Sequence, residues 1–365
     1  MKLLLVEDSA LMRRVLREGF AQETDIEILF ARDGEDAIEK LERFQPDVIT
    51  LDINMPRMDG LTCLAHIMET RPCPVIMLSS LTEKGAIATF EALELGATDF
   101  VAKPDGTVST DISGIIDELL AKIRTAYRKS TKTPKSGGIS LRQPANLNKP
   151  TVPVAVDPRV LKMRPKIDLV VIGSSTGGPG IVQSILECMP TGLPAPIVIA
   201  QHMPPKFTST FASRLDATCK VDVIEVTEAM PLVAGCVYLA SGGRDLVFSR
   251  KFNRLMAQPV KSDPRYTWHP SISRMVESAL GVLDPKRLVG IMLTGMGDDG
   301  SSEMARIHQS GGVTIAESEA SAAVFGMPGK LIEKAGATCV LDAADIPDQL
   351  LRWFGSAAVL RKTKC

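Results

Sequence analysis

The sequence predicts an α/β protein with two doubly wound parallel-sheet domains that are joined by a linker. Two series of short β-branched segments alternate with segments of helical period, and a stretch rich in proline, serine and basic residues separates them. The central strands of the second series are apolar throughout, as expected when helices cover both faces of a sheet. We expect a first domain over 1–126, a linker over 127–166 and a second domain over 167–360.

Composition and charge exclude several classes of protein. The chain has 365 residues, of which 45% are hydrophobic and 4% aromatic, and its net charge is −1. A nucleic-acid partner is therefore not expected, since the chain offers neither a basic field nor a base-stacking surface. The scattered cysteines form no CxxC pair, as in a cytoplasmic protein with reduced thiols. Neither a signal peptide nor a membrane-length apolar run is visible, so we expect a cytoplasmic location without membrane insertion.

The first domain shows five strand signals with helical segments between them. The strands are expected at 2–6, 26–31, 47–51, 74–78 and 99–102. Helical period appears in "SALMRRVLREGFAQ" and "GEDAIEKLERF". This alternation is typical of a doubly wound domain with a parallel sheet.

Charged and hydroxyl side chains follow the ends of these strands. Glu7 and Asp8 follow the first strand, and Asp52 follows the third. Ser79 follows the fourth strand, and Lys103 ends the fifth. Because such strand ends meet at one edge of an open parallel sheet, three carboxylates should crowd beside a hydroxyl and a lysine. Turn and capping roles would explain each acid singly, but together they favour a Mg²⁺ site that can hold a phosphoryl group.

The predicted linker differs in composition from both domains. Residues 128–154 are rich in proline, serine, glycine and basic residues and contain no carboxylate. We interpret the stretch as a solvated tether, with docking onto an acidic surface as the alternative.

The second domain repeats the alternation of strand and helix signals. Strands are expected at 167–173, 195–201, 220–226, 235–240, 287–295, 311–317 and 338–342. Helical segments such as "GIVQSILECM", "SISRMVESAL" and "DGSSEMARIHQ" lie between them. A second parallel sheet is therefore predicted.

The stretch "VVIGSSTGGPG" (170–180) places hydroxyl groups at a turn from a strand into a helix. Its glycines match neither a GxGxxG nor a GK[ST] phosphate-binding motif. A sharp turn of this kind can expose a serine nucleophile, and the helix N-terminus supplies unpaired N–H groups there. Capping of the helix by Ser174 or Ser175 explains the stretch equally well when it is taken alone.

A serine nucleophile needs a base and an orienting acid. His202 directly follows the strand at 195–201, at the same predicted sheet edge as the serine loop, and His269 is a rival. Asp298 and Asp299 follow the strand that ends in "LTGMGDDG". Each residue alone has an ordinary explanation as a cap or turn residue, but their convergence favours a catalytic triad.

These motifs resemble two known families. Residues 1–125 resemble the receiver domain of two-component response regulators, which implies a flavodoxin-like fold. Residues 168–360 resemble the catalytic domain of chemotaxis receptor methylesterases, which implies a Rossmann-like esterase domain. The motifs "IGSSTGG", "QHMP" and "LTGMGDDG" carry the second resemblance, in that order.

In the receiver, the resemblance implies that Asp52 accepts a phosphoryl group from a histidine kinase. Glu7, Asp8 and Asp52 are implied as the Mg²⁺ ligands. The implied switch residues are Ser79, Phe100 and Lys103.

In the esterase domain, the resemblance implies Ser175 as nucleophile, His202 as base and Asp299 as acid. The Met296 N–H is the implied oxyanion donor, and Thr176 lines the site, which needs no cofactor. Two positions depart from the family pattern. Ser174 stands where alanine is usual, and "SGGRDL" (241–246) lacks a histidine that is often present.

The resemblance implies a phosphorylation-activated serine hydrolase for sensory adaptation in chemotaxis. It would demethylate glutamate γ-methyl esters, and deamidate glutamines, on methyl-accepting chemoreceptors. The unphosphorylated receiver would cover the catalytic cleft, and a monomer is expected. The alternatives are a general small-ester hydrolase with a receiver attached and a phosphorylation-switched binding protein whose esterase site has decayed.

Overall fold

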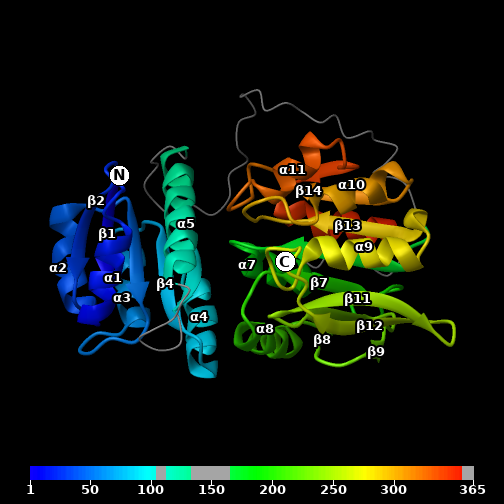
Figure 1. Cartoon of the computed structure of the whole chain (residues 1–365), viewed down its shortest axis with the longest axis horizontal. Helices are drawn as coiled ribbons and strands as arrows, with labels where there is room; N and C mark the ends of the chain where they lie inside the picture. The colour runs from blue at the N-terminus through cyan, green and yellow to red at the C-terminus, as the bar shows by residue number, and fades with distance from the viewer. Residues whose placement is uncertain (104–111, 133–164, 356–365) are drawn as a thin grey trace.

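The chain forms two α/β domains that lie side by side, as Figure 1 shows. The computed structural model describes residues 1–103, 112–132 and 165–355. The predicted linker from residue 133 to 164 and the predicted end of the second domain beyond 355 lie outside these ranges. Within them, no helix combines the length and the apolar character that crossing a lipid bilayer requires.

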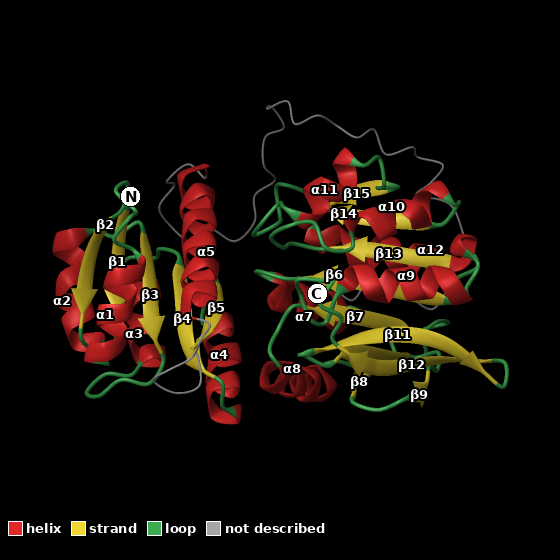
Figure 2. Cartoon of the chain, viewed as in Figure 1, coloured by secondary structure: helices red, strands yellow, loops and turns green. Residues whose placement is uncertain are grey.

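The first domain is a five-stranded parallel sheet with helices on both faces (Figure 2), in the order β2-β1-β3-β4-β5. This is the flavodoxin-like order, so the predicted fold of this domain is confirmed. The strands are β1 (Lys2–Val6), β2 (Glu27–Ala31), β3 (Val48–Asp52), β4 (Val75–Ser80) and β5 (Asp99–Lys103). The helices are α1 (Ala10–Gly19), α2 (Gly34–Phe44), α3 (Gly60–Thr70), α4 (Glu83–Glu94) and α5 (Ile112–Lys132).

Side-chain caps set the beginning of four of these helices. Ser9, Asp33, Asp59 and Thr82 each accept a hydrogen bond from the backbone N–H three residues further on. Such a cap pairs an N–H group that the helix itself leaves unbonded. Helix α5 continues to Lys132, so the first residues of the predicted linker belong to a helix instead.

The second domain is a seven-stranded parallel sheet in the order β15-β14-β13-β6-β7-β10-β8. Its strands are β6 (Leu169–Ser174), β7 (Ile197–Gln201), β8 (Asp222–Val226), β10 (Cys236–Ala240), β13 (Leu288–Met292), β14 (Val313–Glu317) and β15 (Cys339–Leu341). Its main helices are α7 (Gly178–Glu187), α8 (Pro205–Thr218), α9 (Ile272–Val282), α10 (Ser301–Gln309), α11 (Met327–Glu333) and α12 (Ile346–Phe354). All seven predicted strands are present, and β13, β6 and β7 are neighbours at its centre.

A three-stranded antiparallel sheet in this domain was not predicted. It consists of β9 (Met230–Pro231), β11 (Arg244–Lys251) and β12 (Arg254–Lys261). Phe252 and Asn253 join β11 to β12 with φ angles of 48° and 62°, as in the two-residue turns of β-hairpins. Mixed polar and apolar residues on these strands hid them in a search for continuous apolar runs.

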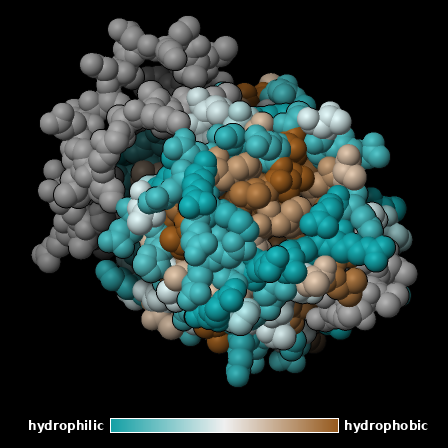
Figure 3. Space-filling model, turned by 90° about the vertical axis from the view of Figure 1, so that its left-hand side faces the viewer, coloured by the Kyte–Doolittle hydropathy of each residue, from teal (hydrophilic) through white to brown (hydrophobic). Residues whose placement is uncertain are grey.

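Aromatic stacking joins the two domains. Helix α4 packs on α8, where the Phe90 and Phe211 rings stack with centroids 5.1 Å apart. Phe100 of β5 stacks on Phe207 of α8 at 4.7 Å. One hydrophobic cluster therefore contains buried side chains from both domains. The outer face of the first domain, away from this contact, is mostly hydrophilic with a small apolar patch (Figure 3).

Candidate active site and candidate phosphorylation site

Three carboxylates meet at the carboxyl edge of the first sheet, as the sequence predicts. One ligand atom from each of Glu7, Asp8 and Asp52 lies within 4.8 Å of the others. The Lys103 ammonium lies 2.8 Å from Glu7 Oε2 and 2.7 Å from Asp52 Oδ2. One lysine thus pairs with two of the three acids.

Burial shapes the electrostatics of this cluster. It raises the pKa of Glu7, and the neighbouring charge of Asp52 raises it further. Burial also raises the pKa of Asp52, although Lys103 acts in the opposite direction. Two buried carboxylates and the exposed Asp8, which a single ammonium does not neutralise, fit a hard divalent cation such as Mg²⁺.

The other two predicted switch residues, Ser79 and Phe100, make contacts outside the acidic cluster. Ser79 is fully buried, and its hydroxyl donates a hydrogen bond to the carbonyl of Gly85 in α4 at 3.0 Å. Phe100 is 5% exposed and stacks on Phe207 of the second domain. Phe100 therefore belongs to the contact between the domains, and Ser79 is bonded to α4, the helix that packs on α8.

In the second domain, hydrogen bonds from neighbouring strands fix the backbone of Ser175. Its N–H donates to the carbonyl of Thr294 at 3.0 Å. Its carbonyl accepts from Gln201 Nε2 at 2.8 Å and from the Gly178 N–H at 2.9 Å. Gly177 follows at φ 74°, in the left-handed region that favours glycine. The loop between β6 and α7 is thus held from both sides.

The two serines of this loop have different surroundings. Ser174 is fully buried, and its hydroxyl has no hydrogen-bond partner among the described residues. Ser175 is half-buried and lines a pocket of about 260 Å³. A Cβ atom at Gly295 would come within 2.7 Å of Ser175 Cβ, so glycine is needed there. Only Ser175 of the pair is accessible to a substrate in this pocket.

His202 and Asp299 are in direct contact. His202 Nε2 lies 2.9 Å from Asp299 Oδ2, and both side chains are mostly buried. Trp268 stacks on the imidazole, with centroids 5.3 Å apart and planes 16° from parallel. His202 Nδ1 is buried and has no partner among the described residues. Because a buried polar atom is rarely left unbonded, Nδ1 is available to a group that enters the pocket.

Asp299, in the loop that precedes α10, accepts several hydrogen bonds from the N-terminus of α9. The N–H groups of Ile272 and Ser273 donate to it at 2.7 Å and 2.9 Å, and the Ser271 hydroxyl donates at 3.2 Å. Burial is the largest effect and raises its pKa, but the hydrogen bonds from His202 and Ser273 outweigh it and lower the pKa overall. Asp298, the alternative acid, is exposed.

The pocket takes its walls from both domains. The second domain contributes Ser175, Thr176, His202, Trp268, His269 and Met296, among others. The Met296 N–H makes no hydrogen bond to the described residues, as an oxyanion donor requires. The first domain contributes Asp99, Phe100, Ala102, Glu118 and Lys122. The first domain therefore narrows the entrance to Ser175.

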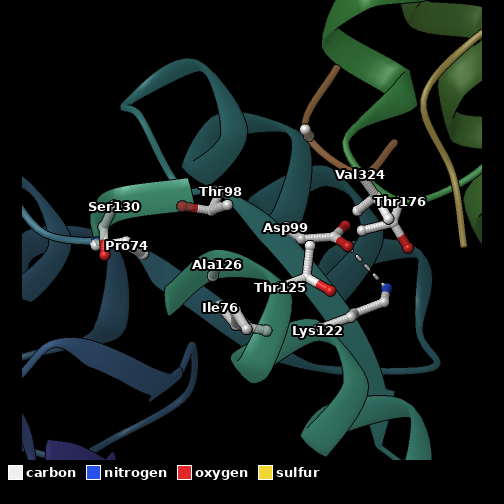
Figure 4. Close-up of a pocket in the computed structure, with 11 residues that line it drawn as sticks. Pro74, Ile76, Thr98, Asp99, Lys122, Thr125, Ala126, Ser130, Thr176 and Val324 are labelled. Atoms are coloured by element: carbon white, nitrogen blue, oxygen red, sulfur yellow. Dashed lines mark ion pairs between the residues drawn. The ribbon is translucent and has the colours of Figure 1, made fainter. Parts of the chain in front are cut away.

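Thr176 also lines a second cavity of about 250 Å³ (Figure 4). Lys122 is buried there, 3.1 Å from Asp99 Oδ2 and 3.0 Å from Glu118 Oε1. Its ammonium also donates to the carbonyl of Phe100 at 2.6 Å. Figure 4 shows this ion pair of the first domain facing Thr176 of the nucleophile loop.

Sequence reasoning missed the residues that support the site. Thr294 Oγ1 donates to the carbonyl of Thr176, and the Thr294 N–H donates to buried Glu317. Asp245, within the noted "SGGRDL" segment, holds His269 at 2.8 Å. The sequence signal for Asp245 was its position in a segment expected to lie next to the substrate cleft.

Known proteins resemble the chain along nearly its whole length. Residues 3–109 match the family model of the response regulator receiver domain, and residues 170–350 match that of the CheB methylesterase. The chain is 48% identical to the protein-glutamate methylesterase/protein-glutamine glutaminase 3 of Rhodospirillum rubrum, across 97% of this chain and 96% of that protein. It is 42% identical to the protein-glutamate methylesterase/protein-glutamine glutaminase 2 of Rhodopseudomonas palustris, across 98% of this chain and 99% of that protein.

Proposed function

Since the chain belongs to the CheB methylesterase family and carries a receiver domain, we propose that it is a phosphorylation-regulated protein-glutamate methylesterase and protein-glutamine glutaminase. It demethylates glutamate γ-methyl esters and deamidates glutamines on methyl-accepting chemoreceptors in the cytoplasm. A histidine kinase supplies the phosphoryl group.

One observation carries the catalytic assignment. His202 contacts Asp299 through Nε2 and keeps Nδ1 unbonded in the pocket that Ser175 lines. Ionised Asp299 only accepts hydrogen bonds, so it holds the proton of the neutral imidazole on Nε2. Nδ1 then has a free lone pair and takes the Ser175 proton as the serine oxygen attacks the ester carbonyl.

The remaining steps follow from this arrangement. The Met296 N–H binds the oxyanion of the tetrahedral intermediate, a role typically worth about 2.7–4 kcal/mol. The His202 imidazolium returns its proton to the leaving group, which departs as methanol from an ester or as ammonia from an amide. Water, deprotonated by His202, then hydrolyses the acyl-enzyme.

The receiver controls access to this pocket. In the docked arrangement, Phe100 and Lys122, with its partners Asp99 and Glu118, line this pocket from the first domain. Glu7, Asp8 and Asp52 would hold Mg²⁺, which neutralises phosphoryl oxygens when bound. A phosphoryl group on Asp52 attracts the Lys103 ammonium. Because Lys103 and Phe100 lie on the same strand, this attraction weakens the stacking of Phe100 on Phe207.

Methanol release from methylated receptor membranes tests the proposal. Ser175→Ala should abolish release because it removes the attacking oxygen, at a cost of about 10⁴-fold or more. Ser174→Ala is the matched control, since it removes a buried hydroxyl outside the pocket and should keep most of the activity. Loss in Ser174→Ala with retention in Ser175→Ala would contradict the assignment. Equal rates on simple esters would instead favour a general small-ester hydrolase.

A further inference from the structure

The catalytic pocket contains a second imidazole–carboxylate pair that the mechanism above does not use. His269 lines the same pocket as Ser175 and His202. Its Nδ1 lies 2.8 Å from Asp245 Oδ1, and its side chain is 23% exposed. The other ring nitrogen, Nε2, makes no hydrogen bond within the described ranges. His269 Nε2 is therefore available to the substrate, in addition to His202 Nδ1.

Asp245 sets which nitrogen of His269 carries the proton. This aspartate is 1% exposed and also accepts hydrogen bonds from the N–H groups of Ser271 and Asp263. Burial raises its pKa most, but the hydrogen bonds from His269 and Arg274 hold the pKa below its usual value. As an ion it only accepts, so a neutral His269 carries its proton on Nδ1 and presents a lone pair at Nε2.

Neighbouring contacts compensate the charge of Asp245 and fix the position of His269. Arg274 lies 2.7 Å from Asp245 Oδ2, so the charge of Asp245 is already compensated without a cationic His269. The preceding residue, Trp268, stacks on the ring of His202. The His269 carbonyl accepts a hydrogen bond from the Gly243 N–H at 3.2 Å. These contacts fix His269 in the pocket that His202 and Ser175 also line.

We propose that His269 determines the activity on glutamine, by accepting a hydrogen bond at Nε2 from the N–H of the substrate amide. The inference rests on the proposed function, since it assumes that one pocket hydrolyses both esters and amides. A primary amide offers two N–H donors, whereas the methoxy group of a methyl ester offers none. An acceptor in this pocket therefore distinguishes the two substrates through their leaving groups.

The contact acts on the step in which ammonia leaves. In the tetrahedral intermediate, His269 holds one N–H and thereby orients the nitrogen lone pair toward the His202 imidazolium. The proton passes from His202 to nitrogen, the C–N bond breaks with its electron pair on nitrogen, and ammonia departs. The carbonyl re-forms as the Ser175 ester. In the ester reaction, the methoxy oxygen takes the same proton from His202 and leaves as methanol, and it gains nothing from His269.

Parallel assays with the full-length, phosphorylated protein test this role. Ammonia release is measured from receptor membranes in the glutamine form, and methanol release from methylated membranes. His269→Asn keeps a donor for Asp245 but removes the group at the Nε2 position. We expect its kcat/KM for ammonia release to fall about ten-fold more than that for methanol release. His269→Gln places an amide oxygen near the Nε2 position and should restore part of the ammonia release.

Each outcome of the comparison is decisive. Equal losses in both activities would overturn the proposal, because they indicate a structural role or a role common to both substrates. Unchanged ammonia release in His269→Asn would overturn it as well. Ser175→Ala separates this failure from failure of the proposed function, since retention of both activities in that variant would refute the triad itself.

Discussion

Asp52 and Asp299 occupy similar places in their domains, but their pKa values shift in opposite directions. Asp52 ends β3 and Asp299 lies in the loop after β13, and each side chain is mostly buried. Burial raises the pKa of both, and the pKa of Asp52 stays raised. Hydrogen bonds lower the pKa of Asp299 below its usual value. The donors around a buried carboxylate therefore decide whether it is a fixed ion or a group that needs a cation.

The largest expected effect comes from substituting Asp299. Asp299→Asn presents an NH₂ group that donates to His202 Nε2, so the ring proton moves to Nδ1 and the lone pair for Ser175 is lost. We expect methanol release to fall about 10⁴-fold. Asp298→Asn, at the exposed neighbour, should leave the rate within about two-fold. A loss below about ten-fold in Asp299→Asn would contradict the assigned tautomer.

On the receiver side, Asp52→Asn removes the proposed phosphoryl acceptor but leaves the esterase pocket intact. Stimulation of methanol release by a small acyl-phosphate donor should disappear, and the unstimulated rate should remain. The measurement compares the rate with and without donor for both proteins. Stimulation of the variant equal to that of the wild type would refute the role of Asp52.

A moderate effect is expected at the contact between the two domains. Phe90→Ala removes a stacked pair with Phe211, worth about 0.5–1.5 kcal/mol beyond its buried area. Undocking becomes easier, so the unphosphorylated rate should rise about three- to ten-fold. Leu11→Ala, at an exposed position on α1, is the control. A rate increase equal to that of the control would argue against docking as the block.

Arg214→Ala tests a weaker part of the same contact. Arg214 pairs with Glu94 of the first domain, and the Glu94 side chain is 53% exposed. Exposed ion pairs contribute about 0–1 kcal/mol, so the unphosphorylated rate should rise less than about three-fold. A larger increase than in Phe90→Ala would reverse this ranking of the contacts.

The smallest effect concerns stability against pH, and its sign differs between the two aspartates. The folded pKa of Asp52 is raised above 3.8, so Asp52 destabilises the fold at neutral pH and the penalty fades as pH falls. Asp52→Asn should therefore raise Tm by a few degrees at about pH 7 and less at about pH 4. The folded pKa of Asp299 is lowered, so its stabilisation persists until pH falls below 3.8. Asp299→Asn should lower Tm similarly at both pH values, as thermal unfolding can check.

The sequence predicts the parallel sheets well because their strands are buried on both faces. Every strand in the two parallel sheets lies within a few residues of its expected place, and their ends gather the acidic cluster and the His202–Asp299 pair. Strand-end logic works since parallel strands all point their carboxyl ends to one edge. It says nothing about which ring nitrogen of His202 contacts Asp299.

What the sequence hides depends on side-chain direction and on pairing between distant segments. Ser174 and Ser175 are neighbours in the chain, and only the turn decides which hydroxyl is buried. The β11–β12 hairpin carries mixed residues, so its pairing is weakly marked, and Asp245 was missed with it. The stacking of Phe100 on Phe207 joins residues far apart in sequence, which no local pattern reveals.

The shared aromatic contact has a consequence for recombination between related genes. Phe90 and Phe100 contribute to a core that the second domain completes. A receiver transplanted into another chain would carry these rings uncovered in water, and its original partner would keep two orphaned phenylalanines on α8. Recombination should therefore exchange the two domains together. A substitution at one stacked ring should be accompanied by a compensating substitution at its partner.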